Sequence, residues 1–202
     1  MKPGDKRMFS AVSTLVWTAS LLNPPIAAPS PRDNVPRLAV RVYGFPGLSP
    51  GLLAASEVEA ARAMRKAPVE LNWLNCTVPG ACSEAEASGD LTIRVVRKAL
   101  PSATSSAAGM AAWSGNKGGA FIFYDRALAL RTHSRLLHHI LGMVMAHEIM
   151  HLLLPEDSHS DWGLMRGNWT ADDLRFDRAA CLEPSVRDRP AGTVGRVPAG
   201  VK

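Results

Sequence analysis

Two histidines, His147 and His151, lie four residues apart in the chain, and Glu148 follows directly after the first of them. On a helix, side chains at this spacing lie on one face, one turn apart. Their imidazoles can then converge on one cation, and zinc takes histidine nitrogens at about 2.0–2.1 Å. Glu148 would flank the metal without binding it. This H-E-x-x-H pattern is typical of zinc hydrolases, in which the glutamate takes a proton from a zinc-bound water.

The segment 134–154 is predicted to be the helix that carries this pattern. Its apolar residues and both histidines follow one stripe at helical spacing. Ser134 is suitable as the N-cap and Pro155 as the stop. The alternative interpretation is a buried helix whose histidines are only hydrogen-bonded.

A catalytic zinc site usually has three protein ligands and one open position. Two candidates for the third ligand follow the helix: Asp157, six residues after His151, and His159, eight residues after it. His159 is preferred, because imidazole suits zinc and because His159-Ser160 leads directly into Gly163-Leu164-Met165. Asp157 remains the alternative.

The H-E-x-x-H sequence, the later His159-Ser160 and the Gly163-Leu164-Met165 ending resemble the metzincin zinc proteases, matrixin-type members in particular. Their longer motif is H-E-x-x-H-x-x-G-x-x-H followed by a methionine turn. The resemblance covers about residues 119–169 and departs from the family in its spacing, because the family glycine falls at Leu154 and the third-ligand position at Asp157. The resemblance implies that Met165 lies beneath the zinc and that the protein is a peptidase.

The activity predicted from these residues is hydrolysis of peptide bonds with one catalytic zinc ion held by His147, His151 and His159. Zinc lowers the pKa of bound water from 15.7 toward about 7 and polarises the scissile carbonyl. Glu148 takes the proton and later delivers it to the leaving amine. The expected partner is a peptide or protein substrate. Two alternatives remain: a secreted binding or structural protein with a closed zinc site that includes Asp157, and hydrolysis of a non-peptide amide.

The first 28 residues are predicted to be a secretory signal peptide. They combine a basic start, an uncharged and largely apolar run over residues 8–22, and Ile26-Ala27-Ala28 as small residues for cleavage. The apolar run is shorter than the roughly 18 residues of a membrane-spanning helix. We therefore expect a secreted or periplasmic protein that is free of the membrane once the signal is removed. An uncleaved N-terminal anchor is the alternative.

The rest of the chain is predicted to form one metalloprotease-like domain over residues 29–182, with a loose tail over 183–202. The formal charge of +5 falls to +3 without the signal peptide, because three basic residues and one acidic residue leave with it. The remaining basic residues are scattered and are not interleaved with aromatic residues. This distribution argues against a nucleic-acid partner.

The hydrophobic pattern predicts an α+β fold with four or five strands and two helices. The resemblance implies that these strands form a small twisted mixed sheet backed by the helices, with the weak strand 107–113 at its edge. A peptide could add to this edge by main-chain hydrogen bonding, and an ordinary edge strand without a ligand is the alternative. Thr170 is a suitable N-cap for a closing helix that reaches about Leu182. The expected strands are 37–43, 69–74, 91–96, 107–113 and 120–124, and the expected first helix runs from Ser49-Pro50 to about Lys66.

The chain has three cysteines, Cys76, Cys82 and Cys181, an odd number for an exported protein. Three pairings are possible, and a Cys76–Cys82 disulfide is favoured because the two flank a short turn-like loop.

Further aromatic and imidazole side chains surround the motif. Surface or capping roles are expected for His133, His138 and His139. Trp162 and Trp169 bracket the methionine turn and are expected either to wall a substrate pocket or to lie in the core.

Overall fold

The computed structural model describes residues 35–82, 89–131, 136–154, 159–169 and 173–174. Several predictions concern residues outside these ranges and stay predictions. They are the signal peptide over 1–28, His133, the Pro155 stop, Asp157, the Thr170 cap with most of the helix that follows it, Cys181 and the tail over 183–202.

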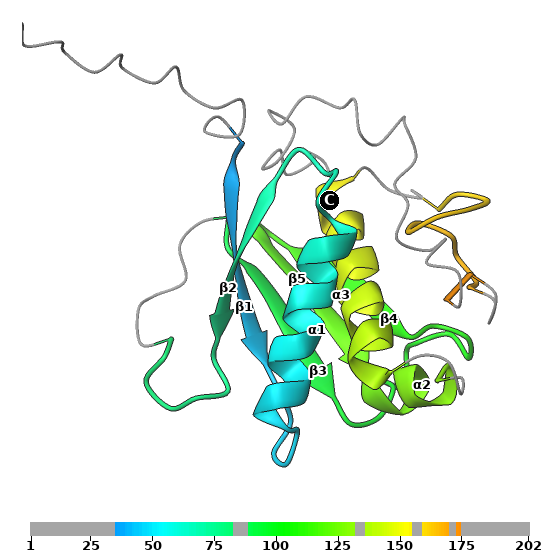
Figure 1. The fold of residues 1–202 in the computed structure, drawn as a ribbon, viewed down its shortest axis with the longest axis horizontal. Helices are drawn as coiled ribbons and strands as arrows, with labels where there is room; N and C mark the ends of the chain where they lie inside the picture. Colours follow the sequence, from blue (N-terminus) through cyan, green and yellow to red (C-terminus); the bar gives the residue numbers. More distant parts are fainter. Residues whose placement is uncertain (1–34, 83–88, 132–135, 155–158, 170–172, 175–202) are drawn as a thin grey trace, which may run out of the picture.

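A five-stranded mixed sheet forms the centre of the protein (Figure 1). Its strand order is β2-β1-β3-β5-β4, with every neighbouring pair parallel except β4 and β5, which are antiparallel. The α+β class, the mixed sheet and the edge position of β4 are therefore as predicted. The strands are β1 (Arg37–Tyr43), β2 (Glu70–Asn75), β3 (Leu91–Val96), β4 (Gly109–Ser114) and β5 (Lys117–Phe123).

The β4–β5 connection is tighter than the sequence indicated. The gap between the expected strands 107–113 and 120–124 reduces to Gly115-Asn116, because Ser114 already pairs with Lys117. Gly115 has a φ of 62°, which a two-residue hairpin turn requires and glycine adopts at little cost. Gly118 belongs to β5 instead of the turn, and the ring of Trp113 covers it so closely that a Cβ there would lie 3.1 Å from the indole.

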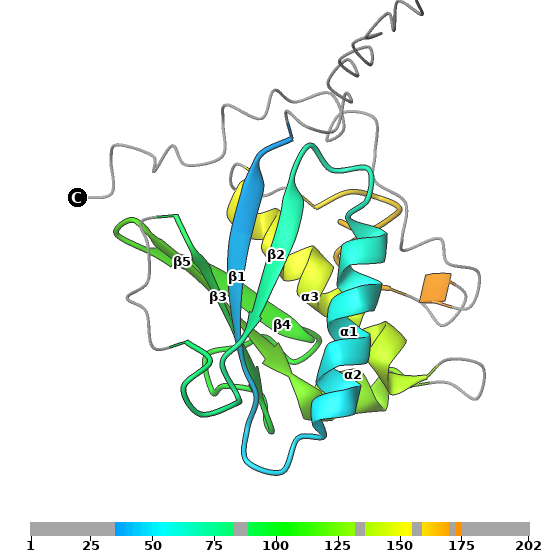
Figure 2. The ribbon, with the colours of Figure 1, turned by 60° about the vertical axis from the view of Figure 1, so that its left-hand side comes forward.

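Helices α1 (Pro50–Ala63) and α3 (Leu137–Leu153) lie side by side over one face of the sheet, and both views show this layer (Figure 1 and Figure 2). The Ser49 side chain caps α1 by accepting a hydrogen bond from the Leu52 amide, as predicted, but the helix ends at Ala63 and not near Lys66. A short helix, α2 (Tyr124–Ala129), follows β5 directly and was not predicted.

Helix α3 is the central element of the core. It begins at Leu137, three residues later than predicted. Leu136 is its N-cap in place of the predicted Ser134, and Leu136 makes no side-chain hydrogen bond. Nearly all of its residues from His139 onward are buried, as expected for a helix that is apolar all round. At Gly142 an added Cβ would lie 2.6 Å from the Ser56 carbonyl oxygen of α1. The absence of a side chain at Gly142 therefore lets the two helix backbones pack closely.

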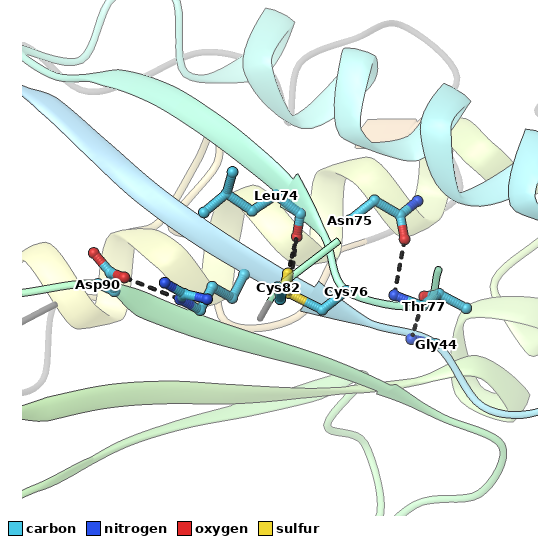
Figure 3. Close-up of a disulfide and its surroundings, with 8 residues drawn as sticks. Gly44, Leu74, Asn75, Cys76, Thr77, Cys82 and Asp90 are labelled. Atoms are coloured by element: carbon cyan, nitrogen blue, oxygen red, sulfur yellow. Dashed lines mark hydrogen bonds and ion pairs between the residues drawn. A yellow bond between two sulfur atoms is a disulfide. The ribbon is translucent and has the colours of Figure 1, made fainter. Parts of the chain in front are cut away.

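The connection from β2 to β3 has to cross β1, because β1 lies between them (Figure 2). Its start is fixed by a disulfide between Cys76 and Cys82, which confirms the favoured pairing (Figure 3). Its end is fixed by an ion pair between the Arg41 guanidinium of β1 and the Asp90 carboxylate, with Nε and Oδ2 2.9 Å apart and both side chains nearly buried. A covalent link and an ionic link thus hold the two described ends of this connection.

Within the described segments, no helix is long and apolar enough to cross a membrane.

Candidate metal centre

The imidazoles of His147, His151 and His159 converge at the C-terminal end of α3. The Nε2 atom of His151 lies 3.0 Å from Nε2 of His147 and 3.1 Å from Nε2 of His159. One nitrogen from each ring lies within 4.8 Å of the other two. The structure thus brings together the three histidines that the sequence singled out. This group could hold a metal ion.

His159 comes from the loop that follows α3, and backbone contacts within this loop hold it in place. The Ser160 amide donates to the Met165 carbonyl at 2.9 Å, and the Arg166 amide donates to the Gly163 carbonyl at 3.2 Å. The turn needs glycine at position 163, where φ is 77°. Gly167 lies directly against the His159 ring, since a Cβ there would be 3.4 Å from Cγ.

The His147 ring is oriented by a hydrogen bond from Nδ1 to the Leu164 carbonyl, 2.7 Å long. A carbonyl oxygen only accepts, so Nδ1 carries the proton and Nε2 presents its lone pair to the other two rings. An imidazole whose second nitrogen donates to a carbonyl in this way has the arrangement usual for a metal ligand.

Burial favours the neutral form of His147 and His151. Burial lowers the pKa of His147 to about 4, and the charges that His151 and His159 would carry lower it further, against the opposing effect of the Leu164 hydrogen bond. Burial and then the charge of His159 also lower the pKa of His151. A metal ion binds only the unprotonated form of imidazole, so these shifts favour metal binding at neutral pH.

The donor set fits a transition metal. Four tetrahedral ligands at about 2.0–2.1 Å from zinc lie about 3.3 Å from one another, close to the two nitrogen–nitrogen distances seen here. Imidazole donors suit zinc, copper, iron and nickel alike. His147 is buried whereas His159 is exposed. The cluster is therefore open to solvent on the His159 side.

Glu148, the predicted proton acceptor, lies buried between α3 and the start of the edge strand. The residue is 5% exposed, and burial alone raises the pKa of its carboxyl to about 8. A Cβ at Gly109 in β4 would lie 2.6 Å from Oε1 of Glu148, so only glycine leaves room for the carboxylate at this point. Within the described residues, no group donates a hydrogen bond to it.

The aromatic residues around the cluster have different surroundings. The Trp169 ring meets the His147 ring edge-on, with centroids 5.3 Å apart, and its Nε1–H donates to the Gly163 carbonyl at 3.3 Å. Trp162 is exposed. Met165 is buried in the hydrophobic core, and its position relative to a bound metal stays a prediction.

His139 corrects one expectation from the sequence. It is a buried residue of α3 and not a surface or capping group, and its Nδ1 lies 2.9 Å from a carboxylate oxygen of Glu59 in α1. Its partner is 80 positions away in the chain, so no local pattern could have indicated the pair. His138 is half-buried.

Two contributors to the site were not found from the sequence, Gly109 and the Leu164 carbonyl. The sequence named Trp169, but not its contact with the His147 ring. The only available signal for Gly109 was its place within the weak expected strand 107–113. A backbone carbonyl has no sequence signature at all.

Neither a protein-family model nor any curated protein matches this chain significantly. Fold and site therefore define its class on their own: it is an α+β protein with a five-stranded mixed sheet, three described helices and a three-histidine cluster able to hold a metal ion.

Proposed function

We propose that this protein is a secreted zinc-dependent peptidase of the metzincin-like type. The observation that carries the proposal is the convergence of three imidazole nitrogens beside a buried carboxylate. His147, His151 and His159 supply the nitrogens, and Glu148 supplies the carboxylate. Perturbed ionisable groups gathered in this way are typical of catalytic sites and are expensive to keep for structure alone.

In this proposal the three histidines hold the zinc ion and Glu148 moves the proton. A bound zinc ion polarises a substrate carbonyl and makes water a better nucleophile at neutral pH. Glu148 accepts the proton of the attacking water and then passes it to the leaving amine. The apolar surroundings that raise the pKa of Glu148 to about 8 suit it to hold that proton between the two steps. A neighbouring cation favours the ionised carboxylate that begins the cycle.

The edge strand supports a peptide substrate over a small amide. One side of β4 pairs with β5, and its other side pairs with no described strand. An extended peptide can add there by main-chain hydrogen bonds. Because Gly109 at the start of β4 lies against Glu148, a peptide docked along β4 passes close to the proton acceptor.

The remaining features are consistent with an exported metzincin-like enzyme. An edge strand, a buried helix that carries two of the three histidines and a later turn that ends in the buried Met165 support this proposal. The Cys76–Cys82 disulfide suits an oxidising compartment, in line with the predicted signal peptide.

The proposal is tested with zinc-loaded protein on casein and on a mixed library of quenched fluorescent peptides. We expect cleavage that a zinc chelator abolishes and that added zinc restores. Glu148→Gln should retain zinc and lose turnover. Absence of cleavage by protein that holds one zinc ion, together with a fourth protein ligand in place of solvent, would instead support the closed structural site.

A further inference from the structure

Trp169 makes two separate contacts with the elements that orient the first histidine of the cluster. The rings of Trp169 and His147 meet edge to face, with an interplanar angle of 81°. The indole Nε1–H donates to the Gly163 carbonyl, 3.3 Å away. One side chain thus contacts both a histidine of the cluster and the turn beside it.

The Gly163 carbonyl is a junction within that turn. It also accepts a hydrogen bond from the Arg166 amide, and this bond closes the turn. The next carbonyl in the chain, that of Leu164, accepts a hydrogen bond from His147 Nδ1–H. The position of the Leu164 carbonyl sets the direction of the His147 lone pair, and the Gly163 peptide group adjoins it. A donor that fixes the Gly163 carbonyl therefore restricts the His147 ring indirectly.

We propose that Trp169 is a positioning residue for the metal centre, and that its indole N–H, beyond its bulk, tunes metal affinity through the Gly163–Leu164 turn. The proposal rests on the metal centre of the proposed function but not on peptide hydrolysis. Partners that orient metal-binding histidines typically contribute about 10- to 100-fold to metal affinity. Trp169 differs from such partners in acting through a turn and a ring contact and not through a direct hydrogen bond.

Trp162 is the matched control. It lies in the same loop as Gly163 but is 48% exposed, and within the described residues its ring makes no aromatic contact and its indole no hydrogen bond. Trp162→Phe therefore removes an indole N–H from the same loop without touching the turn carbonyl or the His147 ring.

The experiment measures zinc affinity of the purified full chain by competition with a chromophoric chelator, for wild type, Trp169→Phe, Trp169→Ala and Trp162→Phe. Phenylalanine keeps a ring but has no donor, and we expect a loss of about 3- to 10-fold, as for one neutral hydrogen bond. Alanine removes both contacts and should cost about 10- to 100-fold. Trp162→Phe should match wild type. The visible absorption of bound Co²⁺ should change in the Trp169 variants alone.

The thermal midpoint, with and without zinc, separates positioning from general stability. A positioning role reduces the increase in midpoint that zinc produces. A merely structural role lowers the metal-free midpoint and leaves that increase and the Co²⁺ spectrum unchanged, which would overturn the inference. Equal losses in Trp162→Phe, or a wild-type protein that binds no divalent metal, would also overturn it. Weakened zinc binding in the Trp169 variants, with no peptide cleaved by any form, would support the inference and contradict only the peptidase.

Discussion

The two ends of α3 each hold a buried histidine near a carboxylate, but they satisfy these groups differently. At the start, His139 contacts Glu59 of α1 at 2.9 Å, and the Arg62 guanidinium contacts the same carboxylate oxygen at 2.9 Å. Toward the other end, Glu148 has no hydrogen-bond donor within the described residues, and the imidazoles of His147 and its two neighbours face one another. Paired polar groups recover the cost of burial, whereas unpaired ones do not. The first end therefore has a paired carboxylate, whereas the second has a buried carboxylate beside three histidines that could hold a metal ion.

Two glycines repeat the same contrast. Gly142 leaves room for the backbone of α1, because its missing Cβ would lie 2.6 Å from the Ser56 carbonyl oxygen. Gly109 leaves room for the proposed proton acceptor, because its missing Cβ would lie 2.6 Å from the Glu148 carboxylate. Substitution of the first should affect stability, and substitution of the second should affect chemistry.

The largest predicted effect separates the two carboxylates. Glu148→Gln should lower kcat by about 10²- to 10⁴-fold, the usual contribution of a general base, while zinc content per chain stays unchanged. Glu59→Gln is the control, because Glu59 of α1 lies beside the start of α3 and contacts His139 and Arg62. It should keep kcat within about twofold of wild type. Steady-state kinetics with metal analysis of each variant measures both. Similar kcat values in Glu148→Gln and Glu59→Gln would contradict the different roles proposed for the two carboxylates.

The next effect concerns Gly109. Gly109→Ala should displace the Glu148 carboxylate and lower kcat by about 10²-fold, as expected for a displacement of about 1 Å, with zinc affinity unchanged. Gly119→Ala is the control, because its Cβ would meet only the Thr92 carbonyl oxygen at an ordinary 3.5 Å. Kinetics and chelator competition on both variants test this. Full activity in Gly109→Ala would mean that the edge strand does not confine the carboxylate.

A smaller effect on stability is expected at Gly142. Gly142→Ala should lower the free energy of unfolding by about 1–3 kcal/mol, since α1 and α3 must move apart to admit the methyl group. Gly51→Ala, at an open position in the first turn of α1, should be neutral or stabilise by up to about 1 kcal/mol. Urea unfolding of the metal-free variants measures both changes. An unaffected Gly142→Ala would contradict the close helix contact.

The smallest effect is a pH dependence at the structural end. Burial alone would raise the pKa of Glu59, but hydrogen bonds from His139 and Arg62, and their charges, hold it below its ordinary value. A carboxyl with a depressed folded pKa stabilises the fold above its unfolded pKa and loses this contribution as the pH falls through the folded value. The free energy of unfolding of wild type should thus exceed that of Glu59→Gln by about 1 kcal/mol or less at pH 7. Urea unfolding at pH 7 and below pH 4 should show this difference shrinking in acid, and a difference that grows instead would contradict the pairing.

Local patterns predicted much of the fold. Strands β1 and β3 have the bounds that their alternating residues indicated, and the Cys76–Cys82 pair was predictable because a short loop joins its members. The start of α3 was missed because Leu136, which offers no capping side chain, precedes it. The six residues of α2 are too short a run for helical periodicity to be recognised.

In the candidate site, too, the sequence predicted some contacts and missed others. His147 and His151 share one helix, so their spacing was sufficient to bring them together. His159 was placed by its sequence context, and the structure brings it to the same point. By contrast, the contact of Gly109 with Glu148 and that of Trp169 with His147 join separate elements of the fold. Only the three-dimensional packing of β4, α3 and the loop after α3 determines them.

The most direct test of the central claim is the zinc content per chain of the purified protein after equilibration with zinc and removal of the excess. We predict one zinc ion per chain for wild type, retention of that ion in Asp157→Ala and its loss in His159→Ala. A zinc-free wild type would contradict the metal centre itself. Loss of zinc from Asp157→Ala with retention in His159→Ala would contradict the assignment of His159 as the third ligand.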